Sequence, residues 1–204
     1  MADVNGSRPV SLREERAAVT RGRITDAARR LFRSRGYGAT TLTDVAREAG
    51  VAVQTIYAVY RSKPGILRAL RESVLQQPDA EALFDEALRE GDGDRKLALF
   101  ASSMRQRWEY GADVVAIHRD AATADRAVRA EVDKVLTIRR SGLGRLAGSL
   151  DDLSAADADV KRATAILDAL TLPEVYIELV DVHGWTPAEF EAWLGRSLRQ
   201  QLID

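Results

Sequence analysis

The stretch from Thr41 to Lys63, TLTDVAREAGVAVQTIYAVYRSK, constrains the fold more than any other part of the chain. Thr41 and Asp44 have the spacing of a capping box, which starts a helix by pairing each side chain with the other residue's backbone N–H. Gly50 favours the left-handed backbone that ends a helix. A second short helix is expected at about 53–60. The stretch therefore predicts two short helices joined by a tight turn.

Three residues of this stretch set how the two helices would pack. Ala46 lets the helices cross closely, Gly50 makes the corner, and Ile56 packs the second helix onto the first. This order and spacing are typical of a helix-turn-helix, whose second helix reads the major groove of DNA.

Charge is divided unevenly along the chain. Residues 1–63 contain 12 Lys and Arg against 6 Asp and Glu, whereas residues 64–204 contain 18 against 25. A basic N-terminal part attracts phosphates and an acidic remainder avoids them, so the division favours double-stranded DNA as a partner.

Helical apolar spacing continues over the rest of the chain, and no segment has the alternation that is typical of a β-strand. The pattern predicts an all-α fold in three parts. We expect a flexible or part-helical N-terminal arm at 1–18, a helix-turn-helix DNA-binding domain with a linking helix at 19–77, and a helical domain for effector binding and dimerisation at 78–204.

Individual helices of the C-terminal part can be placed by their apolar stripes and caps. The helix whose apolar stripe covers 97–108 is expected to end near Gly111, and a longer helix is expected over 126–150. Capping-box spacings begin at Ser154, Thr171 and Thr186 and predict helices at about 155–170, 172–182 and 187–201.

The sequence GYGATTLTDVAREAGVAVQTIYAVYRSK resembles the N-terminal domain of the TetR (tetracycline-repressor-like) family of bacterial transcription regulators, and the likeness runs from about Arg23 to Leu70. Beyond Leu70 the likeness is one of general layout. The resemblance implies a homodimer, typically a repressor, that leaves a palindromic operator when a small-molecule effector binds the C-terminal domain.

By position in the motif, the resemblance also implies two sets of DNA contacts. The base readers would be Thr43, Val53, Gln54 and Thr55, and the phosphate contacts would be Thr41, Tyr57, Arg61 and Lys63. A glutamine amide can both donate to and accept from adenine in the major groove. Ala52 and Val59 stand where the family often has serine and histidine, which predicts weaker or unusual DNA recognition.

The resemblance further implies an effector cavity and a four-helix dimer interface in the C-terminal domain. The candidate cavity residues are Phe100, Met104, Trp108, His118 and Tyr176, for which ordinary core packing is the alternative. The candidate interface residues are Ile166, Leu167, Leu170, Phe190, Trp193, Leu194 and Leu198, for which completion of a monomer core is the alternative.

Composition argues against an enzyme. The chain has no cysteine and two histidines, so neither a zinc site nor a thiol nucleophile is well supported, and we expect no metal and no cofactor. No apolar run approaches the roughly 20 residues of a membrane span, which favours a cytoplasmic protein. The remaining alternative is a helical module that binds protein, whose affinity would depend little on salt.

Overall fold

A computed structural model describes residues 11–75, 78–150 and 157–203, and all regular structure in these ranges is helical. The chain divides into two compact units, Met1–Leu70 and Arg71–Asp204. In the described ranges, no helix combines the length and the apolar character that crossing a membrane requires. The all-α prediction is confirmed.

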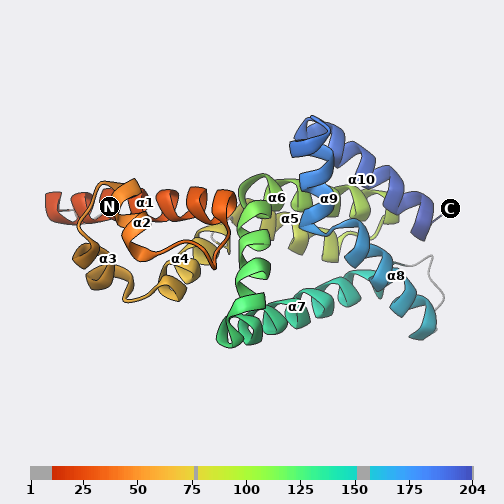
Figure 1. Ribbon diagram of the computed structural model, residues 1–204. Coiled ribbons are helices and arrows are strands. Elements are labelled where there is room, and N and C mark those ends of the chain that lie inside the picture. The colour runs from red at the N-terminus through yellow and green to blue at the C-terminus, as the bar shows by residue number, and fades with distance from the viewer. Residues whose placement is uncertain (1–10, 76–77, 151–156, 204) are drawn as a thin grey trace, which may run out of the picture. The chain divides into compact units, whose positions relative to one another are not determined.

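The first unit contains three helices and the start of a fourth (Figure 1): α1 (Leu12–Arg35), α2 (Leu42–Ala49), α3 (Val53–Tyr60) and α4 (Lys63–Leu75). The helix α4 crosses the boundary between the units, because that boundary lies at Leu70/Arg71. The buried apolar side chains of these helices form the core, which contains Ile24, Ala27, Ala28, Leu31, Phe32, Val45, Ala46, Ala49, Ile56, Ile66 and Leu67.

Capping boxes begin two helices of this unit, one of them the box predicted at Thr41. Ser11 and Glu14 form a capping box at the start of α1, and Thr41 and Asp44 form one at the start of α2. Gly50 ends α2 with φ 64° and ψ 42°, the left-handed conformation that a glycine adopts without a steric cost. The helix-turn-helix is therefore confirmed at its expected bounds.

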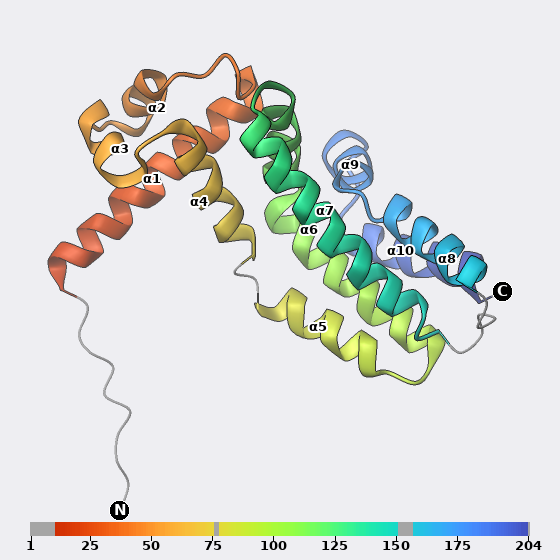
Figure 2. The same cartoon turned by 90° about the horizontal axis from the view of Figure 1, so that it is seen from below.

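The second unit is a bundle of the remaining helices (Figure 2). Its elements are α5 (Pro78–Arg89), α6 (Gly93–Ala124), α7 (Arg126–Ala147), α8 (Asp157–Leu170), α9 (Pro173–Tyr176), the π-helix η1 (Ile177–Val182) and α10 (Pro187–Leu202). The helix α6 packs against α5, α7 and α10, and α8 packs against α7 and α10. Fully buried Phe100, Leu146 and Leu167 lie in their common core.

The expected helix end at Gly111 is wrong, because α6 runs unbroken from Gly93 to Ala124. A Cβ atom at Gly111 would lie 2.3 Å from Cγ1 of Val74, so the missing side chain is what allows these two segments to approach. Glycine at this position serves close packing rather than helix termination.

The expected cap at Thr171 is also wrong, since α9 is preceded by Leu172 and has no side-chain cap. The Thr171 hydroxyl instead donates to the carbonyl oxygen of Leu167 at 2.5 Å and accepts from Arg139 at 2.7 Å. The capping box of Thr186 with Glu189 is confirmed, and Ser154 lies outside the described residues.

Candidate DNA-binding surface and ligand pocket

The helix α3 presents one buried and one exposed face. Ile56 is fully buried beneath it, whereas Gln54 and Tyr57 point to solvent, with 54% of Tyr57 exposed. Val53 and Thr55 are half-buried, and Thr43 is exposed on α2. Of the side chains predicted to read bases, Thr43 and Gln54 are therefore exposed on the surface of the first unit, and Val53 and Thr55 are partly exposed.

Two hydrogen bonds connect α1 to α3 and to the turn before it. The Tyr60 hydroxyl donates to the carbonyl oxygen of Arg21 at 3.2 Å, and Arg23 donates to the carbonyl oxygen of Gly50 at 3.4 Å. The N-terminus of α3 has no side-chain cap, because Ala52 occupies the N-cap position. The backbone N–H groups of its first two residues, Val53 and Gln54, precede the first internal bond from Thr55 to Ala52 and can donate to an anion.

Thr41 is committed to the N-terminus of α2. Its hydroxyl accepts from the backbone N–H of Asp44 at 3.1 Å and donates to Oδ2 of Asp44 at 2.6 Å. The hydroxyl and the backbone N–H of Thr41 together lower the pKa of the Asp44 carboxyl. The phosphate role predicted for Thr41 therefore has to coexist with a structural one.

The phosphate contact predicted for Lys63 has to be corrected, because its ammonium donates hydrogen bonds to backbone carbonyls of the same chain. Nζ donates to the carbonyl oxygens of Tyr37 at 2.7 Å, Thr40 at 2.9 Å and Gly38 at 3.5 Å. An ammonium has three N–H groups, and these three carbonyls match that number. The geometry assigns Lys63 to the segment that leads into α2 and leaves no free donor for a phosphate.

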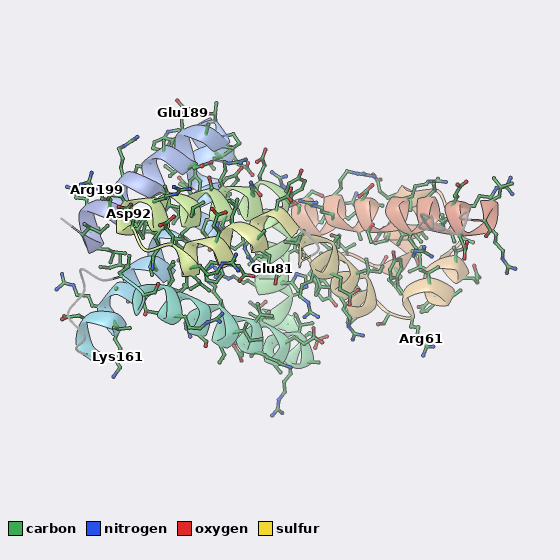
Figure 3. All side chains as sticks on the ribbon, turned by 180° about the vertical axis from the view of Figure 1, so that it is seen from behind. Arg61, Glu81, Asp92, Lys161, Glu189 and Arg199 are labelled. Atoms are coloured by element: carbon green, nitrogen blue, oxygen red, sulfur yellow. The ribbon has the colours of Figure 1, made fainter. Side chains whose placement is uncertain are left out.

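Arg61 ends α3 with φ 64°, which makes it the one non-glycine residue with positive φ among the residues described. Its side chain is exposed and projects away from the ribbon (Figure 3). The guanidinium predicted to contact phosphate is thus presented to solvent at the end of the helix.

The second unit contains a cavity of about 380 Å³ among α5, α6, α7 and the last turns of α4. Its apolar wall includes Phe84, Phe100, Met104, Trp108, Val132 and Leu136. Val135 and Ile138 also line it and are 43% and 63% exposed. A cavity of this size with a mostly apolar wall is typical of a small-molecule site.

Charged side chains also reach this cavity. Arg71 pairs with Glu131 at 2.7 Å, and Arg139 donates to Asp168 at 2.9 Å and to the carbonyl oxygen of Thr171 at 2.9 Å. Burial lowers the pKa of the Arg139 guanidinium, and the hydrogen bond to Asp168 opposes that change. The Arg139 guanidinium therefore remains fixed at the wall by its partners.

Residues 24–70 match the family model of bacterial regulatory proteins of the tetR family. The chain carries a TetR-family domain. The HTH-type transcriptional regulator TtgR of Pseudomonas putida is similar to it, with 38% identity over 79 residues, which cover 39% of this chain and 38% of that protein. The chain thus matches about two fifths of the length of this curated relative.

Solved structures resemble the chain well beyond the TetR-family domain. The regulator FadR from Bacillus subtilis, in complex with stearoyl-CoA, has a TM-score of 0.64 at 18% identity and covers 87% of this chain and 96% of its own. A complex of SmeT with triclosan has a TM-score of 0.65 at 20% identity, with coverage of 91% and 92%. At these identities the likeness shows the fold.

Four of the five side chains predicted for a cavity lie on the wall of this one. Phe100, Met104, Trp108 and His118 line it, whereas Tyr176 does not and instead packs edge-on against Phe190 at 4.9 Å. The prediction missed Arg107 and Arg139, although a signal was present. Arg107 has helical spacing with Met104, and Arg139 with Leu136 and Leu143, so each arginine interrupts an apolar stripe.

The predicted dimer residues divide into two groups. Leu167, Phe190, Leu194 and Leu198 are fully buried within the single chain, so their assignment to an interface is wrong and the monomer-core alternative holds for them. Ile166, Leu170 and Trp193 are half-buried and stay a prediction. Hydrophobic spacing alone does not separate the inward face of a helix from one that meets a second subunit.

Proposed function

We propose that the chain is a transcription regulator that binds a palindromic DNA site as a homodimer and releases it when a small molecule fills the cavity. One observation carries the proposal. It is the exposed polar face of α3, held on buried Ile56 within a TetR-family domain. The helical second unit, which resembles other regulators of this fold, supports the ligand-dependent part.

The recognition chemistry follows from the residue types on that face. The Gln54 amide suits the adjacent donor and acceptor of adenine, and the Thr55 methyl suits the methyl group of thymine. The Tyr57 hydroxyl and the Arg61 guanidinium suit phosphate oxygens, which set the register without reading sequence. The excess of basic residues in 1–63 adds attraction to any duplex.

Two-fold symmetry is proposed because one short helix reads too few bases for useful specificity. A dimer would place two copies of α3 in successive major grooves, roughly 34–36 Å apart. The partly exposed apolar side chains Ile166, Leu170 and Trp193 are the surface proposed for the second copy. As a DNA-bound regulator, the protein would act in the cytoplasm.

The proposed coupling between ligand and DNA uses α4. This helix begins at Lys63 in the first unit, and its residues Arg71 and Val74 line the cavity of the second. A ligand that moves these two side chains would act on the same helix that holds the segment before α2. The ligand would favour dimers whose recognition helices no longer match the groove spacing.

Selection of bound sequences from random duplex DNA, followed by a salt series on the preferred site, tests the proposal. We expect a palindrome, and an affinity whose logarithm falls with a slope of about −0.9 per neutralised phosphate against the logarithm of salt concentration. Gln54→Ala should change the preferred base, whereas Gln200→Ala, on the exposed surface of α10, should not. Absence of any enriched sequence would overturn the proposal.

A second pair of variants, each a change of tyrosine to phenylalanine, tests the phosphate contact predicted for Tyr57. Tyr57→Phe should weaken binding to all duplexes alike, because it removes a phosphate contact. Tyr110→Phe is the control, since Tyr110 is 55% exposed in the second unit and Tyr57 is 54% exposed. Equal affinities of the two variants would contradict the role of Tyr57.

A further inference from the structure

Four arginines of the cavity wall are partly buried, and Arg107 is the one among them that forms no ion pair with a described residue. Arg71, Arg119 and Arg139 each form an ion pair, with Glu131, Glu174 and Asp168 respectively. The Nε atoms of Arg107 and Arg71 are both buried without an acceptor among the described residues, but Arg71 pairs with Glu131 through another nitrogen. In the described ranges, no ion pair places a carboxylate against the Arg107 guanidinium.

The surroundings of Arg107 leave its charge poorly compensated. Burial and then the nearby positive charge of Arg139 lower the pKa of the Arg107 guanidinium, and Glu81 opposes them as the weaker influence. Glu81 is an exposed residue of α5 (Figure 3), so water screens its charge. A buried positive charge without a close partner is costly unless a bound anion neutralises it.

The rest of the cavity suits an apolar body. Phe100, Met104 and Trp108 line the same cavity as Arg107, so aromatic and thioether surfaces share its wall with the guanidinium. The Trp108 indole N–H already donates to the carbonyl oxygen of Thr171 at 3.2 Å. The cavity wall therefore combines a guanidinium, which binds anions strongly, with apolar surfaces that need no charged or hydrogen-bonding partner.

We infer that the cavity binds a small monocarboxylate with an apolar body, and that the carboxylate pairs with Arg107. The planar guanidinium presents two parallel N–H groups that match the two oxygens of a carboxylate. This inference rests on the proposed function, because it names the chemical class of the ligand for the same cavity.

Calorimetric titration of the full chain tests the inference with three probes that share one body. The probes are phenylbutyrate, its uncharged amide, and phenylbutylamine. We expect the acid to bind at least about tenfold more tightly than the amide, as a charge-assisted pair adds over a neutral one. The amine should bind more weakly still.

The net negative charge of residues 64–204 opposes the expected preference for the acid. Residues 64–204 contain 18 basic and 25 acidic residues, so general attraction would favour the amine over the acid. A preference for the acid therefore has to arise locally. If the amine or the amide binds the unaltered protein as tightly as the acid does, the inference is overturned without any variant.

Arg107→Met, which keeps the length of the side chain, should abolish the preference for the acid and retain or improve binding of the amide. Arg162→Met is the matched control, because Arg162 is exposed on α8 and does not line the cavity. A preference for the acid that survives Arg107→Met would contradict the assignment to this residue.

The titrations use no DNA, so failure of this inference is distinguishable from failure of the proposed function. An acid that binds through Arg107 but leaves DNA affinity unchanged would support the inference and contradict ligand-controlled release. If the protein binds DNA and an uncharged compound releases it, while the acid does not bind, the proposed function is supported and this inference is contradicted.

Discussion

The Nζ atom of Lys63 lies 4.3 Å from the centre of the Tyr37 ring and donates a 2.7 Å hydrogen bond to the carbonyl oxygen of the same residue. A second bond reaches the carbonyl oxygen of Thr40, immediately before the N-cap residue Thr41. The first residue of α4 therefore fixes the segment from which α2 starts.

Lys63→Met should lower the free energy of unfolding by about 1–3 kcal/mol, because it leaves partly buried carbonyls without donors. DNA affinity should fall, while its salt dependence stays unchanged, since no phosphate contact is lost. Urea unfolding and DNA titrations measure both, with Lys161→Met on the exposed surface of α8 as control. A salt slope reduced by about 0.9, with unaltered stability, would instead indicate a phosphate contact.

Thr41 and Thr186 cap α2 and α10 with the same bonding pattern, in different units. Each change to alanine should cost about 1 kcal/mol of stability, because an N-terminal N–H loses its acceptor. Only Thr41→Ala should also weaken DNA binding, and Thr41→Ser should retain both properties. Equal DNA affinities of the two alanine variants would exclude any part for Thr41 in DNA binding.

Gly111→Ala should destabilise the second unit by about 1–3 kcal/mol, because the new methyl group overlaps Val74. Adding Val74→Ala should restore much of the loss. Gly142→Ala is the control, since its Cβ would lie 3.6 Å from the Phe84 ring, an ordinary contact, and alanine favours the helix by roughly 0.5–1 kcal/mol. Thermal unfolding of the four proteins measures these effects. An undiminished cost in the Gly111→Ala/Val74→Ala protein would exclude the steric explanation.

Acid should weaken the contact between Asp168 and Arg139. Burial opposes ionisation of Asp168, but hydrogen bonds and the charges of Arg139 and Arg140 together lower the pKa of its carboxyl below 3.8. Because the folded pKa is below the unfolded one, the contribution to stability is present above the unfolded pKa and is lost as pH falls through the folded value.

Urea unfolding between about pH 5 and about pH 2.5 measures this dependence. Asp168→Asn should be less stable than the unaltered protein at neutral pH, and the difference should shrink toward the acid end. Asp133→Asn, at an exposed position of α7, should show no such convergence. A constant difference between Asp168→Asn and the unaltered protein would contradict the prediction.

The first unit could be predicted closely because its signals are local. The capping box at Thr41, the corner at Gly50 and the buried position of Ile56 each depend on residues within one or two turns. The exposed face of α3 follows from the same periodicity, since a short helix with one buried stripe leaves the other side accessible.

The second unit was harder to predict because its decisive contacts join distant parts of the chain. A glycine such as Gly111 often marks the end of a helix. Here its close approach to Val74 accounts for the glycine within a helix that continues. The same limit applied to Lys63 in the first unit, which matched a motif position although its donors are used by carbonyls more than twenty residues earlier. Leu194 shows the same limit, because an apolar stripe does not reveal which neighbour covers it.

The backbone of Arg61 has one further consequence. A side chain at φ 64° costs roughly 1–2 kcal/mol that glycine would avoid, so Arg61→Gly should stabilise the protein. The same change removes an exposed guanidinium at the end of α3 and should weaken the proposed DNA binding, which thermal unfolding and DNA titration can test together. An engineer who sought a more heat-resistant variant would choose this position early and would obtain a more stable protein with weaker DNA binding.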